Sequence, residues 1–222
     1  ASEASAGPSS ARTLEAIDTL VDVLLDGERI ETPDLEAMLG REETLAAELA
    51  GNESREYARA LMRRTAWLGQ RRDYPGFIRT THAAGALAAR WPGDAALAEI
   101  ELQGGYSRYY FEGDSVDGAA RVRRQLDLLK RTPSTGPRLL STALRMHARM
   151  QFDAQNLDEA LRAMREFEEH ARVHFGLRSA RRSYALTWLG YTLRESGRYT
   201  EGIDALREGA TLAAGVRPYR QA

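Results

Sequence analysis

The sequence predicts an all-α protein, an α-solenoid of antiparallel helix pairs with about ten helices. Along most of the chain, apolar residues recur at the three-to-four-residue spacing of amphipathic helices. Glycine- and proline-rich breakers divide the chain into segments of similar length. The turn residues between the paired segments recur every 42 residues near the C-terminus. No stretch shows convincing strand alternation, so the regular succession of helix lengths favours an all-α chain.

Composition narrows the class of protein. The chain has 222 residues, of which 43% are apolar and 28% charged, which is typical of a folded globular protein. No apolar run reaches the roughly 18 to 20 residues of a spanning helix, so no membrane insertion is expected within this segment. Without cysteine there is no disulfide and no thiolate ligand or nucleophile. Residues 1–55 hold 13 acidic and 4 basic residues, a net charge of −9, whereas residues 56–222 hold 19 and 27, a net charge of +8.

The N-terminal part is expected to be a tail followed by one helical pair. Residues 1–11 are small and polar and predict a disordered tail. Residues 12–52 predict a helical pair that caps the array, with Gly27 as a stop and Pro33 in the first turn of the second helix. At the other end, residues 217–222 are expected to form a short tail. The missing initiator methionine and the end close to a helical pattern suggest a piece excised from a longer protein, through processing or a chosen boundary.

Residues 54–216 are expected to form four helical pairs. Pro75 suits a helix start, and Trp91-Pro92-Gly93-Asp94 is a stop followed by a cap. Asn156 followed by Glu159 resembles a capping box. The four predicted repeats cover about residues 54–92, 94–132, 137–175 and 179–216.

The period is the strongest signal. Gly118, Ala160 and Gly202 each follow an inter-helix turn, and each is 42 residues from the next. The turns agree, because Gly113-Asp114, Gln155-Asn156 and Gly197-Arg198 keep the same spacing. In the last repeat, Gly190, Gly202 and Gly209 cost helix propensity, so close helix packing explains them better than chance.

Around these turns the sequence resembles the tetratricopeptide repeat (TPR) family over about residues 55–216. The residues that match most fully are those of the last repeat: Leu186, Leu189, Gly190, Leu193, Gly197, Tyr199, Gly202, Leu206 and Gly209. The family unit has about 34 residues, so this chain is similar to a long-period variant of about 42 residues, as found in bacterial signalling and sensor regions. The resemblance implies a right-handed, TPR-like solenoid. Phe77, Tyr106 and Phe167 stand where the family has small residues, which predicts looser or shifted packing there.

The resemblance also implies a binding groove, because in this family the first helix of each repeat lines one face. Carried over, the groove residues are Tyr110, Arg145, Arg149, Tyr184, Tyr191 and Arg194. Arginine suits carboxylates and phosphates, and tyrosine supplies rigid apolar area with a polar tip. The predicted ligand is a protein or peptide partner, such as an acidic peptide or a peptide C-terminus, or a small anionic ligand. The alternative is that the tyrosines pack between repeats and the arginines are solvated.

The sequence shows no pattern of a catalytic or cofactor site. It has no phosphate-binding glycine loop, nucleophile elbow, kinase signature or zinc signature. Glu166, His170 and His174 share a helix face, but the pattern favours a solvated face over a metal site. We therefore expect no catalytic residues, no metal and no cofactor. Nucleic acid is not an expected partner, because the arginines are dispersed among acidic residues.

The expected function is that of a non-enzymatic binding module. The resemblance implies the sensor or regulatory region of a bacterial signalling protein, with a diguanylate cyclase (GGDEF) as one candidate output domain. The alternatives are an oligomerisation scaffold and the regulatory region of a transcription factor. A homodimer through the C-terminal repeat is a further expectation. The compartment stays open: periplasmic for a membrane sensor, otherwise cytoplasmic.

Overall fold

The computed structural model describes residues 10–26, 32–91, 94, 97–132 and 136–215, and every regular element in these ranges is a helix. The predicted all-α class is confirmed for this part of the chain. The predicted tails lie outside the described residues, except for Ser10 and for Ala11, which begins the first helix. The helices are α2 (Ala11–Asp26), α3 (Leu35–Ala50), α4 (Arg55–Gln70), α5 (Tyr74–Ala88), α6 (Ala98–Tyr110), α7 (Ser115–Arg131), α8 (Pro137–Asp153), α9 (Leu157–Phe175), α10 (Ala180–Glu195) and α11 (Tyr199–Gly215).

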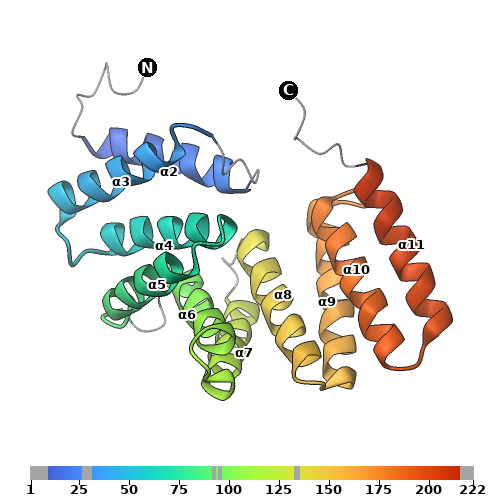
Figure 1. Ribbon diagram of the computed structural model, residues 1–222. Coiled ribbons are helices and arrows are strands. Elements are labelled where there is room, and N and C mark those ends of the chain that lie inside the picture. Colours follow the sequence, from blue (N-terminus) through green and yellow to red (C-terminus); the bar gives the residue numbers. More distant parts are fainter. Residues whose placement is uncertain (1–9, 27–31, 92–93, 95–96, 133–135, 216–222) are drawn as a thin grey trace. The chain divides into compact units, whose positions relative to one another are not determined.

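The chain forms two compact units, unit 1 (Ala1–Arg121) and unit 2 (Val122–Ala222), and the boundary falls inside α7. Within unit 1, α4 packs against α5, and within unit 2, α8 packs against α9 and α10 against α11 (Figure 1). The first helices of successive pairs also touch, α4 with α6 in unit 1 and α8 with α10 in unit 2. Side chains on the first helices of neighbouring pairs therefore share a surface within each unit.

Each hairpin turns through one residue in the left-handed backbone region. In the two best-formed turns, the next amide N–H donates to the carbonyl five residues back, Asn156 to Gln151 at 2.9 Å and Arg198 to Leu193 at 2.8 Å. This bond satisfies a carbonyl at the helix end, as in a Schellman motif. The left-handed residues are 41, 42 and 42 positions apart, which confirms the predicted period: Arg72 (φ 61°), Gly113 (φ 76°), Gln155 (φ 60°) and Gly197 (φ 77°).

The α10–α11 hairpin is packed through glycine, as predicted. A Cβ atom added at Gly190 would lie 2.6 Å from Leu206 Cγ and 2.9 Å from the carbonyl oxygen of Gly202. A Cβ atom at Gly202 would likewise lie 2.9 Å from the carbonyl oxygen of Gly190. The two backbones are thus close enough that a side chain at either position would push the helices apart.

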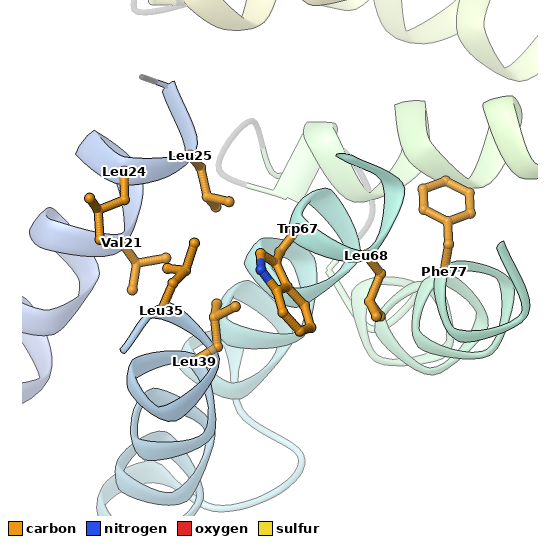
Figure 2. Packing of buried hydrophobic residues seen from close by; sticks show 8 residues of the cluster. All are labelled: Val21, Leu24, Leu25, Leu35, Leu39, Trp67, Leu68 and Phe77. Carbon is orange, nitrogen blue, oxygen red and sulfur yellow. The ribbon is translucent and has the colours of Figure 1, made fainter. Parts of the chain in front are cut away.

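The apolar core of unit 1 joins four helices. Trp67 of α4 lies between residues of α2 and α3 on one side and Phe77 of α5 on the other (Figure 2). Phe77 is 3% exposed, and its ring lies against Gly69, where an added Cβ would be 3.3 Å from Phe77 Cδ2. A glycine on the facing helix therefore makes room for the phenylalanine that the family pattern does not expect. The cluster comprises Val21, Leu24, Leu25, Leu35, Leu39, Trp67, Leu68 and Phe77.

Two local predictions differ from the structure. Helix α6 begins at Ala98, later than the expected start at residue 94. Asn156 is the N-cap of α9, but its side chain makes no capping bond and donates instead to Gln151 Oε1 at 3.1 Å. Glu159 is bound by Arg162 and lies beside His147, so its side chain is engaged away from the helix start. The predicted capping box is therefore wrong.

Candidate interaction surface

Helix α10 of unit 2 carries a row of three aromatic side chains. Tyr184, Trp188 and Tyr191 stand at i, i+4 and i+7, so they share one face of the helix. The ring centroids of Tyr184 and Trp188 are 6.2 Å apart, and those of Trp188 and Tyr191 are 5.5 Å apart. This spacing is that of an aromatic row in contact.

Helix α8 supplies two arginines and a phenylalanine to the same place. The guanidinium of Arg149 lies 3.7 Å from the ring centroid of Trp188, and that of Arg145 lies 5.9 Å from the ring of Tyr184. Phe152 meets Trp188 edge-on, with the ring centroids 5.6 Å apart. These contacts define the arginine–aromatic surface: Arg145, Arg149, Phe152, Tyr184, Trp188 and Tyr191.

The arginine–aromatic surface is open to solvent but only partly charge-compensated. Tyr184 and Tyr191 are each 39% exposed. Arg149 Nε donates to both carboxylate oxygens of Asp153, each at 2.9 Å, on the same helix. Arg145 makes no ion pair with the residues that the structure describes. The surface therefore combines one arginine held by an internal carboxylate with one arginine that has no carboxylate partner among the described residues.

Four of the six predicted groove residues come together on this surface: Arg145, Arg149, Tyr184 and Tyr191. Arg194 is exposed at its head, but its stem runs along α11, where an added Cβ at Gly202 would lie 3.0 Å from Arg194 Cγ. Tyr110 belongs to unit 1, where its ring lies 4.6 Å from that of Tyr106 and 4.7 Å from that of Tyr109. That all six residues bind a ligand stays a prediction.

The residue that sequence reasoning missed is Trp188. Its ring touches Tyr184, Tyr191, Phe152 and the guanidinium of Arg149, so it is the centre of the arginine–aromatic surface. The sequence does contain a signal for Trp188, because it stands four residues, about one helical turn, after Tyr184 and therefore shares its helix face. The groove positions of the TPR family, transferred to this sequence residue by residue, did not include Trp188.

The face of α9 that carries Glu166, His170 and His174 is mostly exposed, and it makes polar contacts with neighbouring helices. Lys130 of α7 pairs with Glu166, with 2.6 Å between Nζ and Oε1. His170 Nε2 lies 2.9 Å from the carbonyl oxygen of Pro137, and burial lowers the pKa of His170. Among the residues that the structure describes, no group of three His, Cys, Asp or Glu side chains could hold a metal ion. None of the described helices is both long and apolar enough to cross a membrane.

Comparison with known proteins shows the fold. No protein-family model matches the sequence, and no curated protein matches it either. Among solved structures, the chain is similar to BtubC (BKLC) from P. vanneervenii, with a TM-score of 0.69, 11% sequence identity, and coverage of 95% of this chain and 83% of that one. It is also similar to TPR-like repeats of a putative kinesin light chain from Podosopora anserina, with a TM-score of 0.59, 12% identity, and coverage of 96% and 99%.

The chain has a TPR-like fold. This confirms the predicted solenoid of antiparallel helix pairs. In this chain, α8 and α10 carry the surface described above, and they are the first helices of two successive pairs. The low identity transfers the fold alone, so the partner has to be argued from the surface chemistry.

Proposed function

We propose that this TPR-like chain is a non-catalytic protein-interaction module that binds a carboxylate-bearing peptide on the arginine–aromatic surface. The observation that carries the proposal is the stack of Arg149 on Trp188. Beside it lie two tyrosines that are each 39% exposed and Arg145, which pairs with no carboxylate in the part of the chain that the structure describes. Arginine forks bind carboxylates with two parallel hydrogen bonds. Aromatic side chains add contact area at a low cost in conformational entropy.

The stacking orients the arginines before a ligand arrives. A guanidinium that lies on a ring has lost part of its rotamer freedom, so less entropy is lost on binding. Tryptophan, the residue type of Trp188, is among those most enriched at the centres of protein interfaces. Phe152 supports its ring from the side, which favours a fixed orientation of the indole.

Asp153 competes with any ligand carboxylate for Arg149. Its carboxylate already occupies Arg149, so a peptide carboxylate has to compete with an internal one of the same kind. Arg145 offers the stronger first contact for that reason. Removing the competitor with Asp153→Ala should therefore raise the affinity for acidic peptides and leave that for neutral peptides unchanged.

A panel of synthetic peptides tests the proposal. The titrated peptides are rich in aspartate and glutamate, and they are compared with their alanine-substituted versions and with versions that have an amidated C-terminus. Trp67 and Trp91 are replaced by phenylalanine, so that the fluorescence followed is that of Trp188. We expect acidic peptides to bind, and the double reversal Arg145→Glu, Arg149→Glu to weaken binding at least tenfold. The matched control is Arg162→Glu with Arg172→Glu on α9, which makes the same change of charge. Equal affinity in the two double variants would refute the proposed surface.

A second candidate function, self-association through α11, has one observation in its favour. Ile203 stands 42 residues after Leu161, at the same place in the repeat. Leu161 is 6% exposed and lies in one apolar cluster with Leu193 of α10, whereas Ile203 is 43% exposed. Light scattering of the wild-type protein over a hundredfold range of concentration tests self-association. A constant mass equal to that of the monomer would rule it out. A regulatory role in a bacterial signalling protein, with a diguanylate cyclase or a DNA-binding output, stays a prediction of the resemblance.

A further inference from the structure

A charge cluster around the buried Arg63 and Glu42 joins α2, α3 and α4 of unit 1, and its carboxylates Asp18 and Asp22 are 25% and 42% exposed. Arg63 of α4 has a side chain only 4% exposed, and it is bound by two acidic residues of α2 and one of α3. The carboxylate of Asp22 accepts hydrogen bonds from Nε and Nη2 of Arg63, at 2.8 and 3.1 Å. Nη1 lies 2.7 Å from Glu42 Oε1 and 3.4 Å from Asp18 Oδ2. One guanidinium is therefore shared by three carboxyl groups.

The charges of this cluster do not balance when all groups are ionised. Three carboxylates against one guanidinium leave a net charge of −2 around Glu42, whose side chain is 1% exposed. An uncompensated buried charge is strongly destabilising. One bound proton would halve the excess, so the electrostatics favour a protonated carboxyl within the cluster.

The hydrogen bonding indicates where that proton sits. Asp18 Oδ1 and Glu42 Oε2 are both buried, and neither has a donor among the residues that the structure describes. An ionised carboxylate only accepts hydrogen bonds, whereas a protonated carboxyl also donates one. A single proton between Asp18 and Glu42 would satisfy both oxygens at once.

We propose that Asp18 and Glu42 share a proton that locks α2 onto α3 and α4, so that α2 is held more tightly as the pH falls. The proton links the helices because Asp18 belongs to α2 and Glu42 to α3. Asp22 and Arg63 are the other charged groups of the cluster, and they hold α2 to α4 without the proton.

The titration of Glu42 agrees with this geometry. Burial raises the pKa of Glu42 to about 8, in spite of the Arg63 charge, and the charge and hydrogen bond of Asp18 add to the increase. When α2 is released, Glu42 meets water and its pKa returns toward the ordinary value of 4.5. Between these two values the locked state holds one more proton than the released state. The locking equilibrium therefore weakens about tenfold per pH unit from about pH 5 to about pH 8 and is flat above.

Release of α2 would uncover an apolar surface. Val21, Leu24 and Leu25 of α2 pack in one cluster with Leu35, Leu39 and Trp67 (Figure 2). When α2 leaves, these partners on α3 and α4 become accessible, so the proton controls whether unit 1 presents an apolar face.

Amide hydrogen exchange of the whole chain, read by mass spectrometry from pH 5 to pH 9, tests the lock. Each measurement is divided by that of the Glu42→Gln variant at the same pH, which cancels the chemical exchange rate. The glutamine can still donate to Asp18 but does not titrate. We expect the relative protection of α2 to fall about tenfold per pH unit up to about pH 8. The protection of α4 should stay higher than that of α2 at each pH, because α2 opens without unfolding the unit.

Two further variants separate the shared proton from a general effect of charge. Asp18→Asn should weaken the pH dependence of α2, because it removes the carboxylate that shares the proton of Glu42, and it carries the test if Glu42→Gln does not fold. Asp22→Asn removes a carboxylate that takes no part in sharing, so it should keep the pH dependence. The proposal is overturned if Asp18→Asn leaves the pH dependence unchanged, if Asp22→Asn abolishes it, or if α2 is as well protected as α4 at each pH.

Discussion

Units 1 and 2 are built from the same kind of helix pair, but they fill the space between helices differently. In unit 1, α2, α3 and α4 meet around the buried Arg63 and its three carboxyl partners. In unit 2, α10 and α11 meet backbone to backbone at Gly190 and Gly202. A repeat fold thus tolerates either solution. Unit 1 should respond to charge and protonation, and unit 2 to the volume of a single added group.

The largest effect is expected from removing the centre of the charge cluster. Arg63→Met leaves Glu42, Asp18 and Asp22 without their cation, and unit 1 should lose about 3–5 kcal/mol of stability. Urea unfolding read from Trp67, with the other two tryptophans replaced by phenylalanine, measures it. The matched control is Arg64→Met. Arg64 pairs with Glu43 at a more exposed site, where the two side chains are 21% and 22% exposed, so this change should cost less than about 1 kcal/mol. Similar losses in both variants would contradict a central role for Arg63.

In unit 2 the corresponding change is the addition of one methyl group. Gly190→Ala places a Cβ against Leu206 Cγ and the backbone of Gly202, so α10 and α11 have to separate. The cost should be about 1–3 kcal/mol, read from the unfolding of unit 2 through Trp188 fluorescence. Gly85→Ala in α5 is the control. No atom lies within 4 Å of its added Cβ, so it should stabilise unit 1 by up to about 1 kcal/mol. A stabilising Gly190→Ala would show that the helices do not need this close approach.

The two solutions differ in how far the sequence predicts them. The approach at Gly190 and Gly202 follows from a short-range pattern, small residues at fixed places beside a turn. The charge cluster does not, because Glu42 and Asp22 come from separate helices 21 and 41 residues before Arg63. Which charged residues become buried depends on how α2 and α3 cross α4, which no local period encodes.

The arginine–aromatic surface is less predictable from the sequence than the glycine contact and more predictable than the charge cluster. Helix spacing places Tyr184 and Tyr191 on one face, and the repeat places Arg145 and Arg149 on the neighbouring first helix. The stack of Arg149 on Trp188 depends on the exact register between α8 and α10, so it emerges only from the structure. The pair of Arg149 with Asp153 has i, i+4 spacing, yet only the structure shows that Asp153 competes with a ligand.

Changing the pH should move the stabilities of the two units in opposite directions. Because the pKa of Glu42 is raised to about 8, folded unit 1 binds a proton that the unfolded chain releases above about pH 4.5, and unit 1 weakens as the pH rises from 5.5 to 8. Burial lowers the pKa of His147 in unit 2, so the unfolded chain gains the proton first, and unit 2 weakens as the pH falls below about 6.5. Thermal unfolding read from Trp67 and from Trp188, each as the sole tryptophan, separates the two responses. Glu42→Gln should flatten the first, and His147→Gln should reduce the second, to which His170 also contributes because burial lowers its pKa too. Parallel responses in the two units would contradict this assignment.

The smallest effect should be the same in both units, because they share the hairpin turn. Arg72 in unit 1 and Gln155 in unit 2 occupy the left-handed position that Gly113 and Gly197 fill in the other turns. A residue with a side chain pays about 1–2 kcal/mol in this conformation, and glycine avoids this cost. Glycine also loses more conformational entropy on folding, which offsets part of the gain in stability. Arg72→Gly and Gln155→Gly should therefore each stabilise their unit by less than about 1 kcal/mol, seen as a rise in Tm of a few degrees at most. The reverse change, Gly197→Ala, should destabilise unit 2 by a similar amount. If Arg72→Gly and Gln155→Gly differ in sign, the turns are not equivalent, and the difference between the units extends from their interiors to their hairpins.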